Sequence, residues 1–124
     1  MSVQNALIEM FSGDSKILRY TVKDGSGAVI NITGAAFRWG LFKLDTDEST
    51  PTAKNSTVLT PPGEKTVGSG IVLTDPTNGV LEVTLDPANT APLKGSFYHE
   101  LEMILTETST VAFGQIDIKR DGLE

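Results

Sequence analysis

The side chain with the most catalytic potential in this chain is its single histidine, His99. An imidazole can act as a general base, a metal ligand or a pH-sensitive switch, and each role needs a partner group nearby. His99 stands between Phe97 and Leu101, at alternate positions of a segment rich in apolar residues. This spacing places the ring on the apolar face of a strand, which favours a core residue over a catalytic base.

Three carboxylates that stand close together, Asp45, Asp47 and Glu48, could bind a calcium ion. A calcium-binding loop also needs further oxygen ligands and a glycine at fixed spacing, and this stretch has no glycine. Solvated loop charges are therefore the favoured interpretation, and we predict no metal site.

Two further patterns are better explained by turns than by chemistry. Asp75 and Asp86 could be the paired carboxylates of a hydrolase, but each precedes a proline, and Asp-Pro is a common turn start. Gly25 and Gly27 could cradle a phosphate, but a cradle needs a following helix N-terminus, and no helical pattern follows. Both patterns predict turns.

An aromatic platform for sugars is the last candidate, built from Trp39, Tyr20 and Tyr98. The alternation of apolar and polar residues puts Trp39 and Tyr20 on core-facing sides and leaves Tyr98 on a polar face beside Glu100. One tyrosine is not a platform, and aromatic residues make up only 6% of the chain. We therefore predict no catalytic, cofactor-binding or metal-binding residue, and no enzyme.

Composition narrows the remaining function classes. The chain has 124 residues, which suits one domain over residues 1–122, with Leu123-Glu124 interpreted as the remnant of a purification tag. The absence of cysteine excludes thiolate catalysis and disulfides. The net charge is −6 and the basic residues are scattered, so neither nucleic acid nor an anionic membrane is an expected partner. The N-terminal segment carries no pattern of a signal peptide.

Short segments of alternating residues, separated by turn residues, predict the architecture. We expect strands at 5–11, 16–23, 35–44, 56–60 or 64–68, 70–74, 79–85, 96–106 and 110–119. No long helical period is present, so only a turn near residues 87–93 is expected to be helical. The fold class is therefore all-β, an antiparallel sandwich or barrel, with a long loop over 45–63.

The stretch GIVLTDPTNGVLEVTL predicts a β-hairpin that crosses from one strand to the next at Thr74 to Gly79. Asp-Pro starts the turn, and Asn-Gly closes it with a positive φ at the glycine. The first strand, over 6–11, and the last, over 111–118, are expected to be the open edges of the sandwich.

Three segments carry a family resemblance. GDSKILRYTVKDGSGAVINITGAAFRWGLFK is followed by GIVLTDPTNGVLEVTLDPANTAPLKGSFYHELEM and then by VAFGQIDIKR. This layout resembles the immunoglobulin-like β-sandwich domains of phage and prophage tail proteins and is similar to the N-terminal module of baseplate upper proteins. The resemblance covers roughly residues 10 to 120 and consists of turns and strand faces, with no catalytic signature.

The resemblance implies an immunoglobulin-like antiparallel sandwich of about seven to eight strands, with Trp39 at the core centre. The corner tyrosine of such domains is replaced here by Phe97, so its hydrogen bond is expected to be absent or to come from the neighbouring Tyr98. The implied function is a non-catalytic structural module of a virion tail or baseplate, assembled in the bacterial cytoplasm. The implied partners are other tail or baseplate proteins, with homo-oligomers as a further expectation. The alternative function is a sandwich module that binds carbohydrate or a cell surface.

Overall fold

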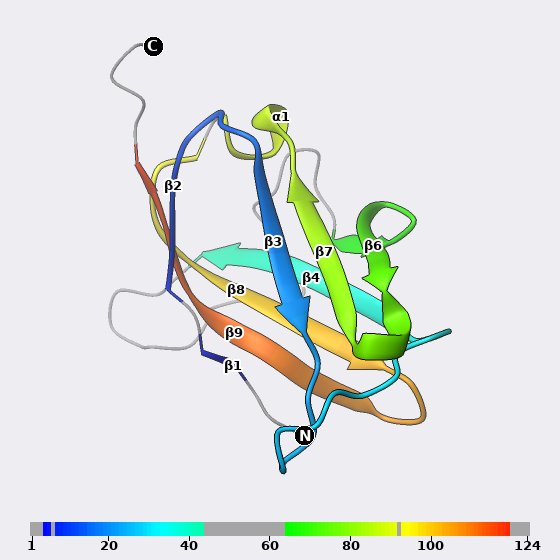
Figure 1. Cartoon of the computed structure of the whole chain (residues 1–124). Coiled ribbons are helices and arrows are strands. Elements are labelled where there is room, and N and C mark those ends of the chain that lie inside the picture. The colour runs from blue at the N-terminus through cyan, green and yellow to red at the C-terminus, as the bar shows by residue number, and fades with distance from the viewer. Residues whose placement is uncertain (1–3, 6, 44–63, 92, 120–124) are drawn as a thin grey trace.

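The computed structural model describes residues 4–5, 7–43, 64–91 and 93–119, and this part of the chain is all-β. One sheet of nine strands contains the order β1-β9-β8-β4-β5-β6-β7-β3, and β2 also pairs with β9 (Figure 1). The strands are β1 (Gln4–Asn5), β2 (Ile8–Phe11), β3 (Lys16–Thr21), β4 (Ala36–Lys43), β5 (Lys65–Val67), β6 (Gly70–Asp75), β7 (Val80–Leu85), β8 (Gly95–Ile104) and β9 (Thr108–Lys119). A 3-10 turn, η1 (Pro76–Asn78), and one helix, α1 (Pro87–Thr90), complete the fold.

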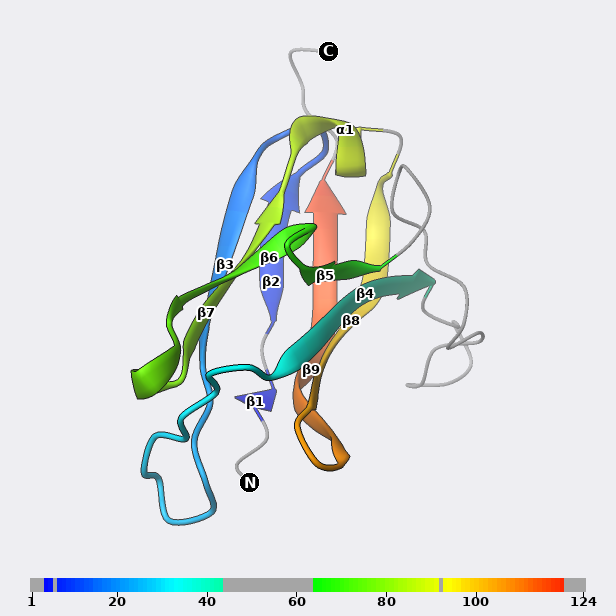
Figure 2. The same cartoon turned by 90° about the vertical axis from the view of Figure 1, so that its right-hand side faces the viewer.

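The sheet curls so that its two halves face each other. Strands β9, β8 and β4 form one layer, and β3, β7 and β6 form the other (Figures 1 and 2). The short strand β5 joins the layers, because it pairs antiparallel with β4 and parallel with β6. Gly68 and Gly70 have φ of 88° and 96°, a backbone conformation that lets the chain turn sharply between β5 and β6.

The core lies between the two layers and is formed by alternate side chains of the strands. In β4 the buried residues that face the opposite layer are Phe37, Trp39 and Leu41, and in β7 they include Leu81 and Val83. Each fully buried apolar side chain of this size stabilises the fold by about 1.5–3 kcal/mol. The predicted faces of these strands are confirmed.

The predicted hairpin is confirmed in its strands and in its turn. β6 and β7 pair antiparallel, and η1 connects them. Gly79 has φ of 75° and its N–H donates to the carbonyl of Pro76 over 3.1 Å. The side-chain amide of Asn78 donates to Asp75 Oδ2 over 3.0 Å, so both ends of the turn are held.

Two predictions about strand pairing are wrong. The last strand is not an edge, because β9 pairs with β8 on one side and with β1 and β2 on the other. The sheet is also not purely antiparallel, since β1 and β2 run parallel to β9, and β5 runs parallel to β6. Alternation identifies which face of a strand is buried but not which strands are neighbours, so it could not predict this order.

The other predictions from the sequence are either confirmed or concern residues that the structure does not describe. The first strand, here β1 and β2, lies at an edge, and a helical turn is present at α1. Of the two alternatives for the fourth strand, 64–68 matches β5, while 56–60 lies outside the described residues, as does the loop predicted over 45–63. The tag remnant predicted at residues 123–124 also lies outside them.

Candidate functional site

The structure brings together three of the candidate residues at the centre of the core. The His99 ring on β8 stacks on the Trp39 ring on β4, with centroids 6.2 Å apart and planes inclined by 21°. Trp39 Nε1 donates a hydrogen bond to the Tyr20 hydroxyl on β3 over 3.2 Å, which links the two layers. Trp39 and His99 are both 0% exposed. The predicted core positions of all three residues are confirmed.

This cluster offers no route to a substrate. A general base must reach the proton that it removes, and a ring with no exposed surface cannot do so without opening the core. Within the described residues, the buried polar or charged side chains are Ser12, Asn89, Thr90 and His99, none of which is a carboxylate. The position of His99 therefore agrees with a packing role.

Burial makes Tyr20 a source of pH-dependent stability. Loss of hydration raises the pKa of Tyr20 from 10.0 to about 12, and the hydrogen bond from Trp39 acts in the opposite direction. Between these values the unfolded chain loses the phenolic proton while the folded chain keeps it. The unfolded state then binds fewer protons, so the free energy of unfolding falls as pH rises.

We therefore expect the Tyr20 contribution to fall by about 1.4 kcal/mol for each pH unit between 10 and 12. Urea unfolding in buffers across this range measures the slope. Tyr20→Phe, which cannot ionise, is expected to flatten the slope even though its stability at neutral pH is lower. An equally steep decline in Tyr20→Phe would contradict this assignment.

A second aromatic cluster lies on the outer face of the β9-β8-β4 layer, and the sequence analysis did not predict it. The ring centroid of Tyr98 lies 6.4 Å from that of Phe42 and 6.5 Å from that of Phe113. Burial raises the pKa of Tyr98, and the charge of Glu100 adds to this effect. We call Phe42, Tyr98 and Phe113 the aromatic row. Cross-strand register creates it, because Phe42 pairs with Tyr98 across β4 and β8.

The aspartates that resembled catalytic pairs hold turns, as predicted. Asp86 begins α1, where its backbone N–H donates to Asn89 Oδ1 over 2.7 Å. The same Asn89 oxygen accepts a hydrogen bond from Lys65 Nζ over 2.9 Å, which ties α1 to β5. Asp75 begins η1. These contacts stabilise local structure, since a side-chain oxygen that accepts a backbone N–H satisfies an otherwise unpaired donor.

The Gly25–Gly27 segment is a turn, also as predicted. Asp24 Oδ1 accepts hydrogen bonds from Ser26 Oγ over 2.6 Å, from Ser26 N over 2.9 Å and from Ala28 N over 3.1 Å. These bonds, led by that from the Ser26 hydroxyl, lower the pKa of Asp24. The Asp24 carboxylate thus already accepts the two backbone N–H groups, of Ser26 and Ala28.

The described part of the chain was compared with two further kinds of site, a metal-binding cluster and a ligand pocket. It contains no group of three or more His, Cys, Asp or Glu side chains that could hold a metal ion. The cluster of Asp45, Asp47 and Glu48 lies outside the described residues. An open pocket of about 200 Å³ lies at the β8–β9 turn and is lined by Ile30, Met103, Leu105, Thr106, Glu107 and Ser109. Among the described residues that line it, Glu107 is the only charged one, so they supply no acid–base pair.

Comparison of the chain with known protein families and with curated proteins found no match to either. In the residues that the structure describes, no helix has the length and apolar character needed to span a membrane.

Proposed function

We propose that this chain is a non-catalytic structural and interaction module of a phage or prophage tail or baseplate. One observation carries the proposal. His99, Trp39 and Tyr20 pack in the core, while the outer edges of β2 and β3 pair with no other strand of the described residues. A domain whose reactive side chains pack in the core and whose edge strands are exposed is suited to binding another protein, because an exposed edge can pair with a strand of a partner. The turn-and-strand layout that resembles tail-protein domains supports the same role.

The immunoglobulin-like assignment is part of this proposal. Two facing layers and a fully buried Trp39 support it, because a buried Trp in the core is common in immunoglobulin-like sandwiches. The parallel pairing of β2 with β9 and the bridging strand β5 depart from two separate antiparallel sheets. The corner hydroxyl is not supplied by Phe97, and the neighbouring Tyr98 lies in the aromatic row on the outer face.

Mass spectrometry of gradient-purified tail particles from the bacterial strain that carries the gene tests this function. We expect the chain in a fixed ratio to the other tail subunits, alone or as a homo-oligomer. Particles that lack the chain, together with a monomeric chain free in the lysate, would contradict the proposal.

The aromatic row favours one second candidate, a carbohydrate- or cell-surface-binding module. Tyr98 and Phe113 are partly exposed, whereas Phe42 is only 5% exposed. The sugar-facing surface would therefore consist of two rings beside Glu100. Aromatic rings pack on apolar sugar faces, and carboxylates accept bonds from hydroxyl groups.

A glycan array screened with the unmodified chain and with Tyr98→Ala tests this alternative. If it holds, the unmodified chain binds at least one glycan, and Tyr98→Ala weakens that binding by roughly tenfold or more. Ile17→Thr, a change on the opposite layer, serves as the control and is expected to keep the signal. If the unmodified chain bound no glycan on the array, the carbohydrate-binding function would be rejected.

A further inference from the structure

The strand register places Glu100 among the three rings of the aromatic row. Glu100 pairs with Phe113 across β8 and β9, and with Gly40 across β8 and β4. Tyr98 lies two positions before Glu100 on the same face of β8, because alternate residues of a strand share a face. Gly40 has no side chain, and a Cβ added there would lie 2.7 Å from the Phe42 ring. The Phe42 ring therefore lies over Gly40, so aromatic rings border Glu100 across both strand pairs and along β8.

The negative charge of Glu100 has no basic partner among the described residues. None of the salt bridges between them includes Glu100. Glu100 is half-buried, and its Oε1 accepts a long hydrogen bond from Thr110 Oγ1 over 3.4 Å. Arg38, which lies on the same face in β4, is already engaged: it donates to both oxygens of Glu64 over 2.6 and 2.7 Å and lies 3.9 Å from Glu102. A carboxylate beside three rings is thus left for an external cation.

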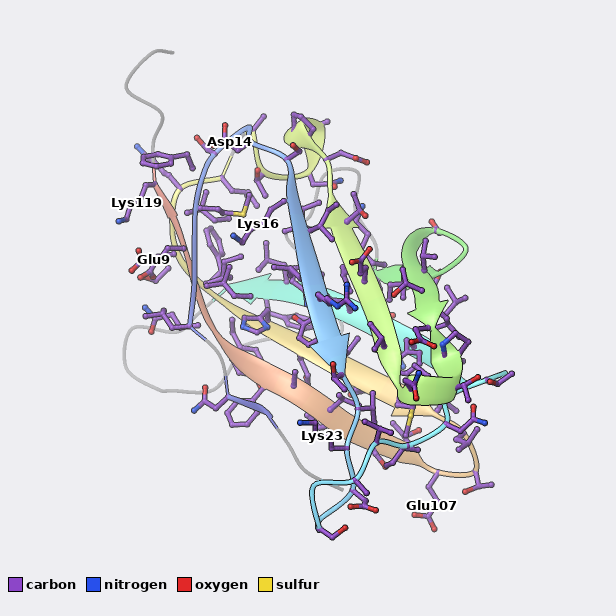
Figure 3. The ribbon with its side chains drawn as sticks, in the orientation of Figure 1. Glu9, Asp14, Lys16, Lys23, Glu107 and Lys119 are labelled. Atoms are coloured by element: carbon purple, nitrogen blue, oxygen red, sulfur yellow. The ribbon has the colours of Figure 1, made fainter. Side chains whose placement is uncertain are left out.

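The charged side chains on this outer face are mostly acidic. In the described parts of β2, β4, β8 and β9 they are Glu9, Glu100, Glu102 and Asp117 against Arg38 and Lys119. Lys119 Nζ lies 3.6 Å from Glu9 Oε2, and the two side chains lie close together in Figure 3. A second copy of the chain would present the same excess of carboxylates, and like charges facing each other disfavour association. The face is instead complementary to a positively charged group.

Rings beside a carboxylate are chemically suited to a planar cation. The face of an aromatic ring attracts a cation that lies within about 6 Å of its centre. A guanidinium group is planar and weakly hydrated, so it can stack on a ring while its N–H groups donate to a carboxylate. An ammonium group is a compact and strongly hydrated charge, which makes it a poorer match. A neutral sugar would leave the charge of Glu100 uncompensated.

We propose that the aromatic row and Glu100 bind an arginine side chain of a partner protein. This inference rests on the proposed role as an interaction module, and it names the face that binds and the chemistry of the partner. Tyr98 and Phe113 are partly exposed and provide the stacking surface, while Glu100 accepts hydrogen bonds from the guanidinium. Phe42 is only 5% exposed and packs beside Tyr98.

The test is an NMR titration of the full chain with three short peptides that differ only at the central residue, which is arginine, its neutral analogue citrulline, or lysine. We expect the arginine peptide to shift the amide signals of Tyr98, Glu100 and Phe113 with a Kd in the millimolar range, because one side chain makes few contacts. The citrulline peptide is expected to cause no shift, and the lysine peptide to bind roughly threefold more weakly or worse. No shift with the arginine peptide at tens of millimolar, or equal binding of the citrulline or lysine peptide, would overturn the proposal.

Two variants of the chain locate the site. Glu100→Gln removes the charge and keeps the shape, and we expect it to weaken binding of the arginine peptide roughly tenfold. Glu107→Gln makes the same change at the β8–β9 turn, where Figure 3 labels Glu107, and is expected to bind normally. Phe113→Leu keeps an apolar side chain but removes the ring, and should weaken binding roughly threefold or more, with circular dichroism to show that the fold is kept. Unchanged binding by Glu100→Gln or by Phe113→Leu would reject the site.

The failure of this inference can be told apart from the failure of the proposed function. A chain that is present in tail particles but binds no arginine peptide would reject this inference alone. A chain that is absent from tail particles and still binds the arginine peptide through Glu100 would reject the proposed function and leave the binding site standing.

Discussion

Replacing Trp39 with alanine is expected to lower the free energy of unfolding by about 3–5 kcal/mol. The indole is 0% exposed, stacks on His99 and donates a hydrogen bond to Tyr20, so no neighbouring side chain can move in to fill its volume without losing other contacts. Such a loss is a large part of the 5–15 kcal/mol that stabilises a typical domain. Urea denaturation followed by circular dichroism measures it, with the slope of the transition compared between variants.

Two comparison variants show whether the loss comes from the burial of Trp39. Trp39→Phe keeps an aromatic ring in the cavity and is expected to lose less stability than Trp39→Ala, although the hydrogen bond to Tyr20 is lost. Leu7→Ala removes a large apolar side chain that is 63% exposed, and its effect should stay within about 0.5 kcal/mol. If Trp39→Ala proved no more damaging than Leu7→Ala, Trp39 would not be a core residue.

Gly79→Ala is expected to lower the free energy of unfolding by about 2–4 kcal/mol. Gly79 has φ of 75°, a left-handed conformation that costs an alanine energy at any site. An added Cβ would also lie 2.7 Å from the Val22 carbonyl oxygen and 2.8 Å from that of Ile30. Both contacts are with backbone, which cannot rotate away, so the β6–β7 turn and the start of β7 must shift.

Gly25→Ala is the control for this prediction, because no atom lies within 4 Å of the Cβ that it would add. Its effect on stability should stay within about 0.5 kcal/mol, which thermal unfolding of both variants can compare directly. Equal melting temperatures for Gly79→Ala and the unmodified chain would show that the turn adopts another conformation.

The sequence predicts the faces of the strands well because burial has a local signature. Alternation placed Tyr20, Trp39 and His99 inward, and the Asp-Pro and Asn-Gly pairs located the β6–β7 turn, since each residue type restricts its own backbone. Both predictions depend on nearest neighbours in the chain. They are confirmed for that reason.

Strand order and register depend on contacts between distant segments, and there the sequence is a poor guide. Nothing local in β9 indicates that it is flanked on both sides, or that β2 runs parallel to it. The aromatic row escaped prediction for the same reason. Alternation placed Tyr98 alone on a polar face, and only the register of three strands brings Phe42 and Phe113 beside it.

The central claim is that Trp39 and His99 form the middle of a closed core and not the wall of a cleft. Trp39 is the only tryptophan in the chain, so its fluorescence reports on this site alone. We predict emission shifted to the blue of that of free tryptophan and strong protection from quenching by acrylamide, both lost on unfolding in urea. Emission and quenching of the folded chain that match those of a solvent-exposed indole would contradict the claim.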